Sequence, residues 1–119
     1  MNKIDRHNNK YKFTIDYYVF NENGTYISYC PSLDLSTSGD TISKAKSNFK
    51  EMFNLYLETC IEMGTLEADL EAHGWEKVKN NIKLPTFDKL MKKPEMKKLM
   101  NSNIGFNRIP LSTSIPAFV

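Results

Sequence analysis

Cysteine and histidine are scarce in this chain of 119 residues: the only cysteines are Cys30 and Cys60, and the two histidines, His7 and His73, are far apart. A structural zinc site needs about four nitrogen or sulfur ligands at close spacings, and the sequence contains no CxxC pair. We therefore expect no bound metal and no cofactor. The count permits one disulfide, although a domain of this size buries enough apolar surface to fold without it.

Long apolar runs are also missing. The longest stretches without a charged side chain, Asn23–Leu33 and Ile109–Val119, have 11 residues each, whereas a membrane-crossing helix needs about 20. The N-terminal residues are polar and lack the apolar core of a signal peptide. We therefore expect a cytoplasmic protein without a membrane partner. Its 40% of hydrophobic and 25% of charged residues are typical of a globular domain.

Charge is unevenly distributed, although the net charge is only +2. Residues 1–75 contain 7 Lys/Arg and 11 Asp/Glu, a net charge of −4, while residues 76–119 contain 9 and 3, a net charge of +6. We expect an α+β domain over residues 11–75 and a basic extension over 76–119 that is not an independent domain. Either two surfaces bind different partners, or the extension folds back onto the body and complements its charge.

The first half of the domain is predicted to be a β-meander. Residues 11–20 alternate between apolar and polar, the period of a strand with one buried face. Asn23-Gly24 follows, and both residues accept the positive φ angles of a type I′ hairpin turn. Residues 25–30 then form a second strand that Pro31 ends, and residues 33–37 alternate again. The sequence predicts three antiparallel strands.

A long amphipathic helix is predicted to follow the meander. Asp40 or Thr41 can cap its first turn, and Gly64 occupies the position of a left-handed C-terminal cap. Apolar residues recur between them in one helical stripe: Ile42, Ala45, Phe49, Met52, Phe53, Tyr56, Leu57, Cys60 and Ile61. We expect this stripe to lie across one face of the sheet, in the order β-β-β-α.

After the long helix the signals are weaker. Trp75 is expected to be a core anchor, and residues 76–84 are polar without a clear pattern. Two short amphipathic pieces within residues 86–100 are divided by Pro94. The segment 106–115 is extended, and its prolines restrict it to a short or edge strand.

The segment YISYCPSLDLSTSGDT, residues 26–41, resembles the N-terminal domain of HicB-type antitoxins. That family has a hairpin, a Pro-x-Leu turn into a short strand, and a Gly-Asp-Thr motif that opens a long helix. The residues that carry the resemblance are Pro31, Leu33, Gly39, Asp40, Thr41, Ala45 and Phe49. The commonest family form continues Pro-Asp-Leu-Pro-Gly-Cys, whereas this chain has Ser32 and Asp34-Leu35. The resemblance covers about residues 11–75.

The resemblance implies a fold and a function. The β-β-β-α core is closed by a further strand and is described as partial RNase H-like or dsRNA-binding-like. The chain is then not an enzyme but an antitoxin that binds a HicA-like toxin, a small basic mRNA-cleaving nuclease, and covers its catalytic histidine. An acidic body suits a cationic partner. Family members usually add a helix-turn-helix or ribbon-helix-helix that binds promoter DNA; residues 76–119 match neither pattern.

Partner-binding residues are expected on the outer face and edge of the meander, because exposed aromatic side chains often mark interfaces. The candidates are Tyr18, Phe20, Ser28 and Tyr29. The alternative is that they pack on the C-terminal extension or within a homodimer. A homodimer is itself expected because small sheets with exposed edges usually find a partner, but the sequence does not show which edge pairs.

Two other functions are considered. A nucleic-acid-binding regulator would act through the basic extension, where phosphate contacts would come from Lys89, Lys92, Lys93, Lys97 and Lys98. The alternative for these lysines is a solvated helix face. A small nuclease would need carboxylates that converge on Mg²⁺, and the candidates are Asp16, Asp34 and Asp40. Fold analogy alone does not carry catalysis, and Asp40 is equally suited to capping the helix.

Overall fold

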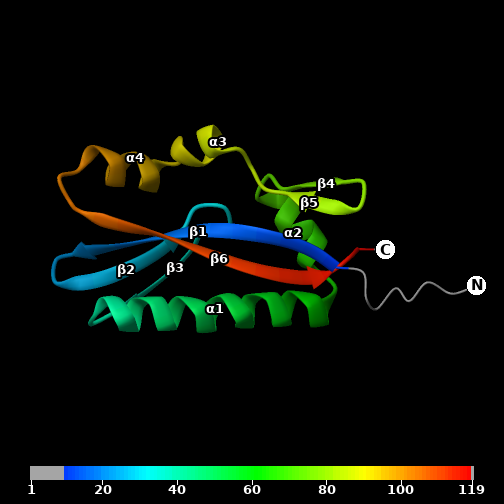
Figure 1. The fold of residues 1–119 in the computed structure, drawn as a ribbon, viewed down its shortest axis with the longest axis horizontal. Coiled ribbons are helices and arrows are strands. Elements are labelled where there is room, and N and C mark those ends of the chain that lie inside the picture. The colour runs from blue at the N-terminus through cyan, green and yellow to red at the C-terminus, as the bar shows by residue number, and fades with distance from the viewer. Residues whose placement is uncertain (1–9, 119) are drawn as a thin grey trace, which may run out of the picture.

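The computed structural model of the protein describes residues 10–118, which form a mixed α+β fold with an antiparallel four-stranded sheet (Figure 1). The elements follow in the order β1 (Lys10–Glu22), β2 (Thr25–Cys30), β3 (Leu35–Gly39), α1 (Ile42–Met63), α2 (Leu66–Ala72), β4 (Glu76–Val78), β5 (Asn81–Lys83), α3 (Phe87–Met91), α4 (Pro94–Asn101) and β6 (Phe106–Pro116). The predicted α+β class and the antiparallel meander are confirmed. No helix of the described residues is long and apolar enough to cross a membrane.

The sheet has the order β3-β2-β1-β6, with every neighbouring pair antiparallel. The predicted hairpin turn joins β1 to β2, and its two central residues, Asn23 and Gly24, have φ angles of 53° and 89°. Strand β6 pairs with β1 along nearly its whole length, from Lys10 opposite Pro116 to Phe20 opposite Phe106. The extended segment near the C-terminus was predicted to be a short or edge strand. It is an edge strand, and with 11 residues it is not short.

One face of the sheet packs on α1 and forms the main core. Alternate residues of β1 point to this side, and the ring of Tyr17 stacks on Phe49 of α1 with centroids 4.1 Å apart. The buried residues of α1 are Ala45, Phe49, Phe53 and Leu57, all members of the predicted stripe. The ends of the stripe, Ile42 and Ile61, remain about two-fifths exposed.

The junction between β3 and α1 explains the Gly-Asp-Thr motif. A Cβ on Gly39 would lie 2.6 Å from the backbone nitrogen of Ala45, a contact that real side chains do not make. The Thr41 hydroxyl accepts a hydrogen bond from the Lys44 backbone N–H at 3.0 Å, so Thr41 and not Asp40 is the N-cap. At the other end Gly64 has a φ of 69° and forms the predicted left-handed cap.

The N-terminal half of β1 extends beyond β2, and the hairpin β4–β5 lies beside it. Trp75 precedes this hairpin and is buried as predicted: its indole N–H donates to the carbonyl of Ser32 at 2.8 Å, and its ring meets Phe13 edge-on at 5.0 Å. No sequence pattern marks β4 and β5, because strands of three residues are too short to show a period.

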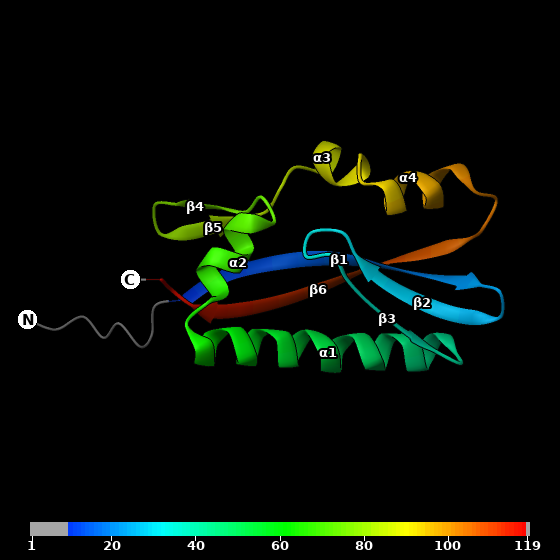
Figure 2. The same cartoon turned by 180° about the vertical axis from the view of Figure 1, so that it is seen from behind.

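Helices α3 and α4 lie on the opposite side of the sheet from α1, as both ribbon views show (Figures 1 and 2). Pro94 occupies the first turn of α4, where its missing N–H costs no hydrogen bond. The chain then returns through β6 to the edge of the sheet. The C-terminal extension thus covers the second face of the sheet and contributes its fourth strand.

Candidate functional site

The face of the sheet opposite α1 carries most of the predicted partner-binding residues, and α4 covers it. Tyr18 and Tyr29 are paired across β1 and β2, and they are only 2% and 7% exposed. Met96 and Leu99 of α4 bury them. Partly buried side chains around this cluster are Phe20, Ile27 and Met91. The prediction that Tyr18 and Tyr29 stand on an open outer face is wrong, and the alternative, packing on the C-terminal extension, is what the structure contains. Phe20 lies on the same face and is only partly buried.

Ser28 lies on the other face of the sheet, away from the tyrosines. It pairs with Val19 and is completely buried beneath α1, where its hydroxyl donates to the carbonyl of Ala45 at 2.8 Å. Its assignment to the outer face together with Tyr29 is therefore wrong. Neighbouring residues of a strand point to opposite faces, so Ser28 and Tyr29 cannot share one.

A carboxylate junction attaches α4 to the sheet. Asp34, in the turn before β3, has a φ of 52°, and its two oxygens accept hydrogen bonds from the Tyr29 hydroxyl and the Lys93 ammonium, each at 2.8 Å. Burial tends to raise the pKa of Asp34, but the hydrogen bonds from Lys93 and Tyr29 outweigh it and the pKa is lowered. Burial, followed by the hydrogen bond to Asp34, raises the pKa of Tyr29. Asp34 is therefore a structural anchor.

A small cleft lies between α3 and the sheet, with a volume of about 190 Å³. Asp16 and Arg108 form an ion pair there, with the carboxylate 2.8 Å from one guanidinium nitrogen and 2.9 Å from another. The guanidinium also lies 5.9 Å from the ring centre of Phe87. The lining residues are Thr14, Asp16, Tyr18, Pro31, Ser32, Leu84, Pro85, Phe87, Leu90, Met91 and Arg108. Its two charges neutralise each other, so the cleft has no free charge for a ligand.

Four of the five predicted phosphate-binding lysines are exposed: Lys89, Lys92, Lys97 and Lys98. The fifth, Lys93, is bound to Asp34. The structure adds three exposed lysines from the β4–β5 hairpin, Lys77, Lys79 and Lys83, which lies on the same side of the sheet as α3 and α4 (Figures 1 and 2). Sequence reasoning missed this grouping because it depends on where the unpredicted hairpin lies.

The carboxylates proposed for a nuclease do not come together. Asp16 is paired with Arg108, Asp34 with Lys93, and Asp40 precedes α1 at the far end of β3. Among residues 10–118, no group of three or more His, Cys, Asp or Glu side chains is close enough to hold one metal ion. The described residues therefore do not assemble the carboxylate site on which that alternative depends.

No protein-family model, no curated protein and no solved structure matches this chain.

Proposed function

We propose that this chain is an antitoxin-like binding protein of the HicB type, which neutralises a small, basic, RNA-cleaving toxin of the HicA type by covering its active site. The observation that carries the proposal is the junction between β3 and α1. At this junction the backbone of Gly39 lies so close to that of Ala45 that no side chain fits, and Thr41 is the N-cap of α1. Two of the three motif residues thus occupy positions where this strand-to-helix junction needs their residue types, which supports a junction of the family's kind.

The arrangement around this junction also supports the proposal. The resemblance implies a hairpin, a third strand, a long helix across one face and a further strand, and the elements β1, β2, β3, α1 and β6 follow that order. We therefore propose that the fold is HicB-like, of the partial RNase H-like or dsRNA-binding-like kind. Between β5 and β6 this chain inserts α3 and α4.

The charge distribution indicates where a basic toxin would bind. Residues 51–76, which include the C-terminal half of α1 and all of α2, contain no Lys or Arg. Their acidic residues are Glu51, Glu58, Glu62, Glu67, Asp69, Glu71 and Glu76. Glu76 lies opposite Lys83 in the β4–β5 hairpin, so the acidic surface is defined by the exposed Glu51, Glu58, Glu62 and Glu71 of α1 and α2. Because α4 covers Tyr18 and Tyr29, we place the toxin contact on this acidic surface, where opposite charge speeds association and selects the partner.

Co-expression with a small basic RNA-cleaving toxin of the HicA type tests the proposal. Growth should be restored, the two proteins should co-purify, and RNA cleavage should stop in the purified complex. The double substitution Glu62→Lys/Glu71→Lys should weaken binding at least about tenfold, because it reverses two exposed charges. The matched control is Lys46→Glu/Lys50→Glu, on exposed positions of the other half of α1, and it should not weaken binding.

Each result has a defined meaning. If the toxin is neither bound nor inhibited, the antitoxin proposal is wrong. If it is inhibited but both double variants bind as well as the original chain, the toxin binds elsewhere and the acidic-surface assignment alone is wrong.

A second candidate function is nucleic-acid binding through the exposed lysines of the β4–β5 hairpin, α3 and α4. The observation in its favour is the grouping of the exposed β4–β5 lysines with those of α3 and α4 on one side of the sheet. Binding of this kind depends steeply on salt, and each lost phosphate contact lowers the slope by about 1. Lys97→Glu/Lys98→Glu should therefore reduce both affinity for duplex DNA and its salt dependence, while a chain without measurable DNA affinity at low salt excludes this function.

A further inference from the structure

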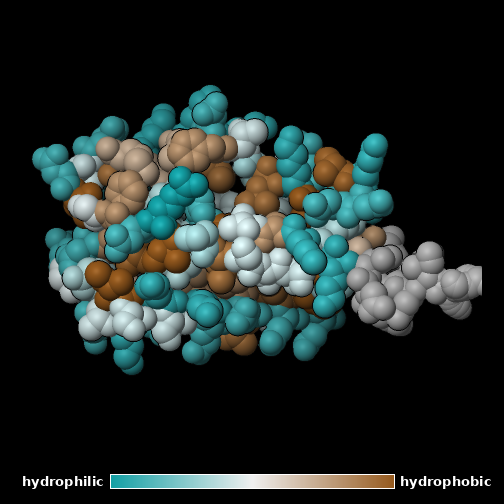
Figure 3. All heavy atoms as spheres, in the orientation of Figure 1, coloured by the Kyte–Doolittle hydropathy of each residue, from teal (hydrophilic) through white to brown (hydrophobic). Residues whose placement is uncertain are grey.

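Strand β6 gives the sheet a long open edge. Its 11 residues pair with β1 on one side, and within residues 10–118 no strand pairs with the other side. Natural proteins usually shorten, charge or cover such an edge, or place proline on it, because it attracts another strand. Pro110 and Pro116 of β6 restrict the registers in which another strand can pair, and the residues between them stay open. Here the only charged residue of β6 is Arg108. Seen from the side on which β6 lies in front, pale and brown surface runs across the middle of the molecule, above a lower rim that is mostly teal (Figure 3).

The hairpin turn determines which backbone groups of β6 point outward. In a two-residue hairpin the flanking residues, here Glu22 and Thr25, exchange backbone hydrogen bonds. Even-numbered residues of β1 therefore bond to β2 and odd-numbered ones to β6. Since Tyr17 lies opposite Ile109, the odd-numbered residues of β6 bond to β1. The backbone groups of its even-numbered residues face the open edge.

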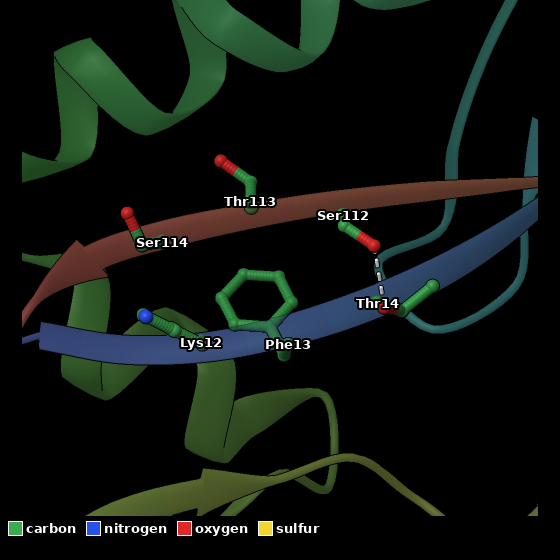
Figure 4. A pocket seen from close by; sticks show the side chains of 6 residues that line it. All are labelled: Lys12, Phe13, Thr14, Ser112, Thr113 and Ser114. Carbon is green, nitrogen blue, oxygen red and sulfur yellow. Dashed lines mark hydrogen bonds between the residues drawn. The ribbon is translucent and has the colours of Figure 1, made fainter.

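Two independent observations agree with this assignment. Pro110 and Pro116 are both even-numbered, and proline within a sheet places its missing N–H on the open side of an edge strand. The Thr14 and Ser112 hydroxyls lie 2.7 Å apart across β1 and β6 (Figure 4). Such close side chains are typical of a pair that does not exchange backbone hydrogen bonds, as expected if Ser112 points its own backbone outward.

From this edge we infer that the protein forms a homodimer in which β6 pairs antiparallel with β6 of a second copy, with Thr113 on the two-fold axis. Ser112 and Ser114 then exchange backbone hydrogen bonds with Ser114 and Ser112 of the second copy. The two sheets join into one continuous sheet. The inference goes beyond the proposed function and does not depend on it.

This register makes the edge complementary to itself. Pro110 lies opposite Pro116 of the second copy, so the positions without an N–H face each other and no donor is left unmatched there. The two proline carbonyls gain no donor from this pair, and the strand-to-strand hydrogen bonds come from Ser112 and Ser114. Leu111 lies opposite Ile115 on the α1 side of the sheet, which places apolar side chains together. Arg108 lies opposite Phe118, so no like charges meet. A register shifted by two residues would set each proline against a residue with a free N–H.

Partly buried apolar side chains border the proposed axis. A shallow trough of about 550 Å³ lies over the paired strands β1 and β6 near Thr113 (Figure 4). It is lined by Lys12, Phe13, Thr14, Ser112, Thr113 and Ser114. On the α1 side, Ile109 and Leu111 are only partly buried although they pack against the main core. A second copy would cover these side chains and extend the core across the axis.

Cysteine cross-linking of the full chain tests the register. In a Cys60→Ser background, which leaves only the fully buried Cys30, Thr113→Cys should form a disulfide-linked dimer under mild oxidation. A residue on the axis lies opposite the same residue of the second copy, with about 5 Å between their Cα atoms, which is within the range of a disulfide. The control is Leu111→Cys, whose two copies lie about 13 Å apart in this register and should not cross-link. Leu111→Cys/Ile115→Cys should cross-link again.

A second pair of variants tests the backbone contacts without cysteine. Ser114→Pro removes an outward N–H as Pro110 and Pro116 already do, so it should yield a folded monomer, while Ser114→Ala should remain a dimer. Mass by light scattering and the circular dichroism spectrum give the two readouts. An original chain that is monomeric at millimolar concentration would overturn the inference, as would cross-linking of Leu111→Cys to the same extent as Thr113→Cys.

Discussion

Replacing Met96 with alanine tests how firmly α4 is attached to the sheet. Met96 is fully buried and, with Leu99, supplies the apolar contact to Tyr18 and Tyr29. Burying two such side chains gains about 3–6 kcal/mol, from which the cost of ordering the helix is subtracted. Removing a buried methionine side chain costs about 2–5 kcal/mol. The substitution therefore removes most of what holds α4, and we expect the helix to detach while the rest of the protein stays folded.

Native-state hydrogen exchange is the assay for this detachment. In the Met96→Ala variant, backbone amides of α4 should lose at least about thirtyfold in protection, which corresponds to about 2 kcal/mol, while those of α1 should keep theirs. Trypsin should cleave after Lys97 or Lys98 more rapidly than in the original chain. The matched control is Met100→Ala, because Met100 is in the same helix but 41% exposed, and it should change neither readout.

The opposite pattern would refute the reasoning. If Met96→Ala lowers protection in α1, β1 and α4 by the same factor, α4 belongs to one cooperative unit with the sheet and cannot detach alone. If protection of α4 is unchanged, the apolar contact does not hold the helix, and the Asp34–Lys93 ion pair carries more than the at most about 1 kcal/mol expected of a partly exposed pair.

Three other predictions follow from the described contacts. Gly39→Ala should destabilise the fold by about 1–3 kcal/mol in urea unfolding, because its Cβ would meet the backbone of Ala45, whereas Gly105→Ala, with open space at its Cβ, should not. Thr41→Ala should cost about 1 kcal/mol through the lost cap, and Thr65→Ala, whose side chain makes no cap hydrogen bond, should cost less in the same assay; equal losses would contradict the capping assignment. The pKa of Asp34 is lowered from 3.8 in the folded state, so its ionised form stabilises the fold at neutral pH and this contribution is lost as the pH falls below that value. In Asp34→Asn and in Lys93→Met, the free energy of unfolding should fall less between neutral pH and pH 3 than in the original chain, and the double variant should show no larger effect than either single one. If both variants lose as much stability over this range as the original chain, the ion pair does not make this contribution.

The sequence predicted the parts of the fold that local signals determine. Asn23-Gly24 requires a turn with positive φ angles, and Thr41 and Gly64 mark the ends of α1 by the hydrogen bonds that helix ends need. The apolar stripe between them identifies the face that packs on the sheet. These features depend on residues close together in the chain, so they can be inferred without knowledge of the rest.

The candidate site depends on contacts between distant segments, and the sequence could not supply them. The three-residue spacing of Met96 and Leu99 predicts that α4 has an apolar face, but it does not show that this face covers Tyr18 and Tyr29. Ser28 is different, because strand alternation alone places its side chain on the opposite face from that of Tyr29. The junction of Asp34 with Lys93 joins residues 59 positions apart, and nothing local marks either residue as a member of a pair.

The pairing of β1 with β6 has a consequence for how the protein is made. Thr14 and Ser112, which meet across these strands, are 98 positions apart, so the ribosome must release almost the whole described chain before β1 gains its second neighbour. Contacts this far apart in sequence slow folding. A nascent chain that stalls before residue 106 carries β1 as an exposed edge, open to proteases and to aggregation. The four-stranded sheet can therefore form only after β6 has left the ribosome.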